Sequence, residues 1–143
     1  MKKGTGCLTV FGGIFFIAGL GIFIWGLVSS VNVWRAQDWS VVEAKIINLE
    51  QVSSTDDGST TYGVKGSYRY RFNGQEYQSN QVTFYSGSDN IGDYQQQLYR
   101  NLKRASSQQK LKAYVNPENP QESVLDRTMR WGMLGFHTIF LLV

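Results

Sequence analysis

GTGCLTVFGGIFFIAGLGIFIWGLVSSVNVW, residues 4–34, contains no Asp, Glu, Lys, Arg or His. A helix rises about 1.5 Å per residue, so about 20 apolar residues cross a hydrocarbon core of about 30 Å. Only a helix suits such a stretch, because lipid offers no partner to an unpaired backbone amide. The stretch therefore predicts a retained transmembrane helix. A cleaved signal peptide is the alternative, but its apolar region would be only ~7–15 residues long.

Charged residues flank this helix unequally. Lys2 and Lys3 precede it, whereas Arg35 follows it and is offset by Asp38. Because the cytoplasmic flanks of membrane helices carry an excess of Lys and Arg, this bias favours a cytoplasmic amino terminus. We therefore expect the following domain to be extracytoplasmic and the chain to reside in the plasma (inner) membrane.

Gly12, Gly19 and Gly26 recur once every two helical turns of this segment. That spacing returns a helix to nearly the same face, where small residues let a second helix approach closely. We interpret these glycines as a helix-packing face. Its partner would be the carboxy-terminal segment of the same chain, another copy of the chain or another membrane protein. The alternative is that glycine is common in membrane helices and the spacing has no role.

A second apolar run, Trp131–Val143 (WGMLGFHTIFLLV), ends the sequence. As a helix it would be ~20 Å long, which is too short to span a bilayer. We interpret it as the start of a second, truncated transmembrane helix in a protein that continues past Val143; a shallow re-entrant segment is the alternative. His137 lies in this run, where an interfacial position or a partner-helix contact is more typical than a functional role.

Residues 35–130 form a polar region between the membrane segments at 1–34 and 131–143. All 11 Asp and Glu residues lie there, as do all of the 14 Lys and Arg residues except Lys2 and Lys3. The region is therefore close to neutral, which gives little reason to expect a polyanionic partner. The chain is predicted to have a membrane-anchored α+β fold. It would combine the first transmembrane helix, a small, mainly antiparallel β domain with one amphipathic helix, and the start of a second transmembrane helix.

The centre of the domain predicts a β-hairpin. Residues 62–72 (YGVKGSYRYRF) alternate aromatic and basic side chains over their second half, and Asn73-Gly74, a strong turn signal, follows. The expected cross-strand pairs are Phe72–Gln75, Arg71–Glu76 and Tyr70–Tyr77. Val82 and Phe84 have the wrong parity for the face that this register buries. We therefore expect a bulge near residues 79–81.

Local patterns predict the remaining secondary structure. Residues 39–52 are rich in Val and Ile, and their apolar set changes parity at Ile47. We therefore expect a strand that bends there or is buried on both faces. Helical spacing of apolar residues from Ile91 to Leu102 predicts the amphipathic helix, with Asp89 or Asp93 as its cap. The other expected elements are a polar loop at 53–61 with a turn at its centre, strands at 111–115 and 122–125, and a rigid turn at 116–120.

Together these segments resemble a known family. The residues that carry the resemblance are Trp39–Ala44, Tyr68–Gly74 with Tyr77, Ala113–Val115, Asn116–Pro120 and Ser123–Leu125. Over about residues 35–130 the chain resembles domain-of-unknown-function family 3592 (DUF family 3592), membrane proteins with a small β-rich domain between helices. The Asn-Pro-Glu-Asn-Pro sequence is the most specific part. The resemblance implies an architecture, but no reaction and no catalytic residue.

Side chains suited to catalysis or metal binding are sparse. Cys7 and His137 are the sole cysteine and histidine, and both lie in apolar segments, so neither a catalytic triad nor a multi-ligand metal site is expected. Residues 56–59 lack the alternating carboxylates of a calcium loop and suit a solvated turn. Asp89 and Asp93 could pair as acid and base, but helix capping explains them more simply. We expect no enzyme activity, no cofactor and no small-molecule substrate; the alternative is an enzyme with an unrecognised carboxylate site.

A basic strand face is the strongest binding candidate. Lys65, Arg69 and Arg71 share one face of the predicted hairpin. Further cations that extend this charge are Arg100, Lys103 and Arg104. The face suits an acidic partner or anionic lipid, where each cation contributes ~1 kcal/mol; a solvated exterior is the alternative. We expect a non-enzymatic interaction or accessory module anchored in the lipid bilayer, without a nucleic-acid partner. A module that binds the anionic membrane surface is the alternative.

Overall fold

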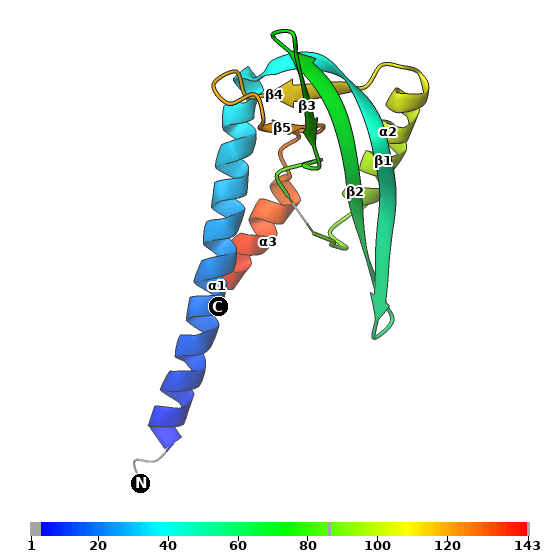
Figure 1. The fold of residues 1–143 in the computed structure, drawn as a ribbon. Coiled ribbons are helices and arrows are strands. Elements are labelled where there is room, and N and C mark those ends of the chain that lie inside the picture. Colours follow the sequence, from blue (N-terminus) through cyan, green and yellow to red (C-terminus); the bar gives the residue numbers. More distant parts are fainter. Residues whose placement is uncertain (1–3, 86, 143) are drawn as a thin grey trace. The chain divides into compact units, whose positions relative to one another are not determined.

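The computed structural model describes residues 4–85 and 87–142 (Figure 1). The chain divides into two compact units, which are described separately. Met1–Val31 and Arg130–Val143 make up the helix unit, and Asn32–Met129 make up the β unit.

The helix unit contains most of α1 (Gly4–Arg35) and the whole of α3 (Trp131–Leu142). Among the described residues, α1 is the one helix long and apolar enough to cross a membrane, a test that a signal sequence would also pass. Most of its exposed side chains are apolar; Leu8, for example, is 74% exposed. α3 has 12 residues, so a second complete span is not seen in the described part of the chain.

The β unit is built on one antiparallel sheet with the strand order β3-β2-β1-β4-β5. Its elements are η1 (Ala36–Asp38), β1 (Ser40–Asp56), β2 (Ser59–Phe72), β3 (Gln75–Ser79), α2 (Tyr94–Ser107), β4 (Lys112–Val115) and β5 (Ser123–Val124). This arrangement confirms the predicted α+β class. The long β1–β2 pair and the α2 helix stand out in Figure 1.

The predicted hairpin is confirmed in full. β2 and β3 pair Phe72 with Gln75, Arg71 with Glu76 and Tyr70 with Tyr77. The loop residues Asn73 and Gly74 have φ angles of 49° and 79°. A two-residue turn needs positive φ at both positions, which Asn and Gly tolerate best.

The polar loop expected at 53–61 is wrong, because most of it forms strand, but the turn expected at its centre is confirmed. β1 and β2 stay paired to Asp56 and Ser59, and only Asp57-Gly58 form the turn, with φ angles of 47° and 77°. Asp-Gly is itself a strong two-residue hairpin signal. Ser and Thr side chains then pair across the ladder, as in the hydroxyl contact of 2.9 Å between Thr55 and Thr60.

The two expected irregularities had different outcomes. The bend in the first strand is confirmed, since the β1–β2 register shifts between Ile46 and Asn48. The bulge near 79–81 is wrong: β3 ends at Ser79 and the chain leaves the sheet. The hydroxyl of Ser79 accepts a hydrogen bond from the backbone amide of Gln81. Val82 is buried in the core beyond this turn, so its burial does not depend on the alternation of side chains along β3.

The amphipathic helix forms, but it is not capped as expected. α2 begins at Tyr94 with Asp93 at the N-cap position, yet the Asp93 side chain makes no capping hydrogen bond. Its carboxylate instead accepts from Nε2 of Gln97. Asp89 stabilises the preceding turn, where its Oδ1 accepts from the amide of Ile91 at 3.0 Å.

Aromatic residues of β2 lie at the centre of the core, on the sheet face that α2 covers. Tyr68 is fully buried, and its hydroxyl donates to the carbonyl of Gln81 and contacts Oγ of Ser123, both at 2.8 Å. The Tyr70 hydroxyl donates to the carbonyl of Pro120 at 2.6 Å. Burial disfavours the charged phenolate, so it raises the pKa of Tyr70 and raises the pKa of Tyr68 to about 12.

Candidate functional site

The sheet has an inner face, which carries Tyr68 and Tyr70 against α2, and an opposite outer face. Side chains alternate along a strand, so Arg69 and Arg71 of β2 lie on the outer face. Lys45 of β1 lies there too, because it stands directly opposite Arg69. All three cations are exposed.

A groove of about 920 Å³ lies over β1 and β2 around these cations. The charged side chains that line it are Glu43, Lys45, Arg69, Arg71 and Glu76. Ser106 and Gln109, at the end of α2 and just after it, add a hydroxyl and an amide. The lining also includes Ala44, Ile46 and Tyr70 of the inner face, which α2 covers. The groove therefore takes in residues of both sheet faces and does not gather its donors on one side.

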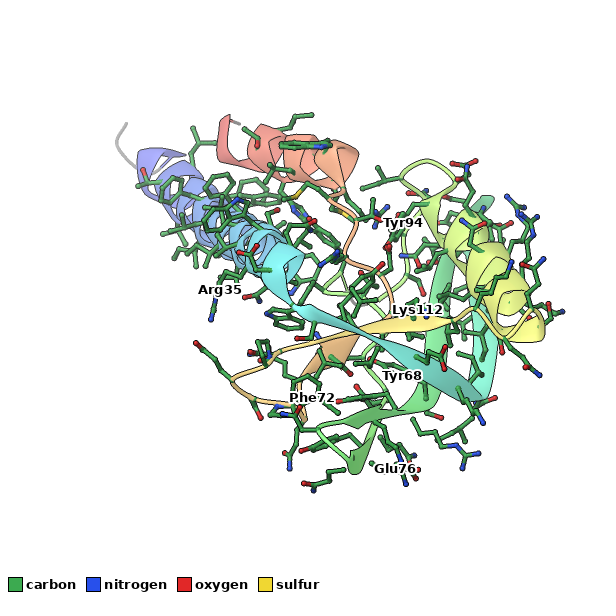
Figure 2. The ribbon with its side chains drawn as sticks, turned by 90° about the horizontal axis from the view of Figure 1, so that it is seen from above. Arg35, Tyr68, Phe72, Glu76, Tyr94 and Lys112 are labelled. Carbon is green, nitrogen blue, oxygen red and sulfur yellow. The ribbon has the colours of Figure 1, made fainter. Side chains whose placement is uncertain are left out.

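Charge is distributed unevenly along the groove. Arg71 stands opposite Glu76 on β3, and the Glu43 carboxylate lies 3.7 Å from Nζ of Lys112 on β4. Figure 2 labels Glu76 and Lys112 on these two strands, which flank β1 and β2 in the sheet. Arg69, by contrast, stands between Lys45 and the neutral Gln78. The positive charge is therefore concentrated on Lys45 and Arg69.

The other predicted cations lie outside this groove. Lys65 shares the outer face and stands opposite the acidic Glu50 in the β1–β2 ladder. The exposed cations of α2 are Arg100, Lys103 and Arg104, and Nζ of Lys103 lies 5.7 Å from the centre of the Tyr99 ring. Sequence reasoning missed Lys45. The parity that places Ala44 on the inner face would have indicated it.

The three predicted packing glycines lie in different surroundings. Gly19 and Gly26 are buried, whereas Gly12 is exposed. A Cβ atom at Gly26 would collide with the imidazole of His137 on α3, but one at Gly12 would meet no described atom within 4 Å. In the helix unit, α3 therefore lies against the carboxy-terminal part of the glycine series.

His137 is 4% exposed, and its ring lies edge-on to that of Trp25 at 5.5 Å between centroids. In the described part of the chain, its Nδ1 atom is buried without a hydrogen-bond partner. Buried polar atoms usually have a partner. This imidazole is thus held by shape and by ring contact.

The candidate carboxylates of Asp89 and Asp93 accept hydrogen bonds from neighbouring residues. Oδ2 of Asp89 accepts from Nε2 of Gln95 at 2.7 Å, in addition to the turn contact already described. Asp57 lies in a hairpin turn, and Cys7 is exposed on α1. Within residues 4–85 and 87–142, no three His, Cys, Asp or Glu side chains gather in a way that could hold a metal ion.

Arg127 joins the places where the chain enters and leaves the β unit. Its guanidinium donates to the carbonyls of Ala36 and Gln37 at 2.8 and 2.7 Å and stacks 4.1 Å above the Tyr114 ring. The Gln37 side chain donates back to the Arg127 carbonyl at 3.1 Å. We call this set of contacts the junction.

Comparison with known proteins identifies one family. The family model described as "Domain of unknown function (DUF3592)" matches residues 42–130. No curated protein and no solved structure matches the chain. The matched range covers more than half of the sequence and includes β2 to β5 and nearly all of β1. The chain therefore belongs to the DUF3592 family.

Proposed function

We propose that this chain is a membrane-anchored, non-enzymatic interaction module that binds its partner through the outer face of the sheet. The observation that carries the proposal is the position of Lys45 directly opposite Arg69 in the β1–β2 ladder. Like charges directly opposite each other destabilise a sheet. A binding role gives this arrangement a benefit that offsets its cost.

Membrane anchoring is supported by α1. This helix is long and apolar enough to span a bilayer. Lys2 and Lys3 favour a cytoplasmic amino terminus, so we place the β unit outside the cytoplasm at the plasma membrane. The bilayer is then one partner. A second copy or another membrane protein is a further one, through the exposed part of α1 around Gly12.

A module that binds the anionic membrane surface is the second candidate. The cations at Lys45, Arg69 and Arg71 favour it, because anionic lipid attracts basic residues near the surface. An enzyme based on Asp89 and Asp93 has less support, since both carboxylates accept local hydrogen bonds. Neither nucleic acid nor a metabolised small molecule is part of the proposal.

Site-specific photo-cross-linking in native membranes tests the interaction role. A photoreactive residue replaces Gln78, which is exposed and stands opposite Arg69 on the outer face. Thr55, exposed at the far end of the β1–β2 hairpin, is the matched control position. We expect a discrete adduct from position 78, lost in K45E/R69E, and none from position 55. Adducts that form equally at both positions, or at neither, would contradict the proposal.

A further inference from the structure

We infer that two copies of this chain pair with each other through the free edge of β3. β3 is the first strand in the sheet order, so one of its edges pairs with β2 and the other faces away from the sheet. In the part of the chain that the structure describes, no strand and no isolated bridge pairs with that second edge. An edge of this kind is a template for a further strand. This pairing goes beyond the proposed function, because it needs no partner on the outer face.

The free edge of β3 presents the backbone groups of two residues. Alternate residues of an antiparallel strand direct their amide and carbonyl groups to opposite edges. Gln75 stands opposite Phe72 across the two-residue turn, so both Gln75 and Tyr77 direct these groups to β2. Glu76 and Gln78 therefore direct their amides and carbonyls away from the sheet. Both side chains are exposed, and Glu76 is labelled in Figure 2.

One antiparallel register suits two copies of β3. With a two-fold axis at Tyr77, Glu76 stands opposite Gln78 of the partner subunit, and the outward backbone groups of these residues meet. The two Tyr77 residues then form a non-hydrogen-bonded pair, the kind in which side chains lie closest. An axis at Glu76 would set two carboxylates opposite each other, which destabilises a ladder.

The same register extends a row of aromatic rings on the inner face. The ring centroids of Tyr68 and Tyr70 are 5.9 Å apart, and those of Tyr70 and Tyr77 are 5.7 Å apart with an interplanar angle of 19°. Tyr77 ends this row and is only partly buried. Tyr77 of the partner subunit would cover its remaining surface, and aromatic cross-strand pairs stabilise a sheet.

The surroundings of the β3 edge suit a second copy better than a charged partner. The amide side chains that line a groove along β3 are Gln75, Gln78, Asn80, Gln81 and Gln121. Among the described residues of that lining, Glu76 alone is charged, and it stands opposite Arg71 of the same chain. An amide side chain both donates and accepts hydrogen bonds, so identical surfaces can meet without repulsion. Two-fold dimers, in which one patch binds itself, are the commonest assemblies of identical chains.

Disulfide cross-linking of the full chain in native membranes tests the pairing. The background is Cys7→Ser, which removes the sole cysteine. Chains with Glu76→Cys are co-expressed with differently tagged chains with Gln78→Cys, and mild oxidation follows. In the inferred register these positions stand directly opposite, about 5.5 Å apart between Cα atoms. Either position and its own copy lie about 7–8 Å apart, which is too far for an unstrained disulfide.

We expect a disulfide between the two tagged chains, about tenfold or more above the level from either variant alone. Thr55→Cys, exposed at the far end of the β1–β2 hairpin, is the control and should give none. Absence of the disulfide in the mixed chains, or equal cross-linking in every variant, overturns the pairing. Cross-linking of Gln78→Cys with itself alone would overturn the register.

The K45E/R69E substitution separates this pairing from the proposed function. It changes the outer face of β1 and β2 and leaves β3 intact, so the disulfide should persist while the adduct with the outer-face partner is lost. At photoreactive position 78, an adduct with the mass of two chains reports the β3 edge. Loss of the disulfide in K45E/R69E would assign the contact to the outer face and overturn the pairing through β3.

Discussion

The helix unit and the β unit each bury an aromatic side chain that carries a polar group, but the two polar groups differ in their hydrogen bonds. His137 lies against Gly26 with its Nδ1 atom unpartnered among the described residues. Tyr68 is buried as deeply, but its hydroxyl is bonded on both sides, to Gln81 and Ser123. The helix unit is therefore held by close packing at small residues, as is usual in membranes. The β unit couples its packing to a fully bonded polar network, and this contrast can be tested.

Tyr68→Ala should have the largest effect. It removes a fully buried aromatic side chain, and such truncations cost about 3–5 kcal/mol of unfolding free energy. Urea unfolding of the full chain in micelles, followed by near-ultraviolet circular dichroism, measures this loss. The helix unit should keep its far-ultraviolet helix signal. A β unit that unfolds at the unchanged urea concentration would show that Tyr68 is not central.

Gly26→Leu should separate α3 from α1, because its side chain would occupy the space of the His137 ring. Gly12→Leu is the matched control, since a Cβ there meets no described atom within 4 Å. The fluorine resonance of Trp25 in fluorotryptophan-labelled chain reports the pairing through the His137 ring contact. We expect it to shift in the Gly26 variant alone. Equal shifts in both variants would mean that α3 does not use this part of the glycine series.

His137→Leu and Tyr70→Phe probe the contrast most directly, since each removes one buried polar function. Tyr70→Phe leaves the Pro120 carbonyl without its donor and should cost about 0.5–1.5 kcal/mol of β-unit stability. His137→Leu removes an unpartnered nitrogen, so the α1–α3 pair should keep or raise its thermal midpoint. That midpoint is read from the Trp25 fluorine signal. A lower midpoint would show that Nδ1 has a favourable contact.

Alkaline pH should destabilise the β unit gradually. Burial raises the pKa of Tyr68 to about 12 from its ordinary value of 10.0, so the neutral hydroxyl is favoured in the folded state. Its contribution is complete below pH 10 and is lost as pH rises toward 12. Between these two pH values the loss approaches about 1.4 kcal/mol per pH unit. Urea unfolding at several pH values should show a shallower decline for Tyr68→Phe; identical slopes would contradict the assignment.

Local sequence signals predicted much of this fold. Asn73-Gly74 identified one hairpin and its register, and the parity change at Ile47 located the β1 bend. Asp57-Gly58 carried an equally strong signal, but the surrounding Ser and Thr residues resemble a loop because they lack an apolar face. Composition does not show that cross-strand pairing will extend a strand through such residues.

Less of the candidate site could be predicted from the sequence. Arg69 and Arg71 were identified by alternation within one strand, but Lys45 joins them only through pairing between β1 and β2. That pairing depends on the register shift between Ile46 and Asn48, a property of two strands together. The same register places Lys65 opposite Glu50, a pairing that the β2 sequence alone does not reveal. Long-range register decides which charges meet, and no single segment encodes it.

The junction also has a mechanical consequence. Tension that pulls the two chain connections apart would load the hydrogen bonds between Arg127 and residues 36–37 first. The β1–β4 ladder begins nearby, at Ser40 and Val115, and would bear load only after those bonds open. We therefore expect the Arg127 hydrogen bonds to break and re-form under a transient pull, while the strands of the sheet keep their register.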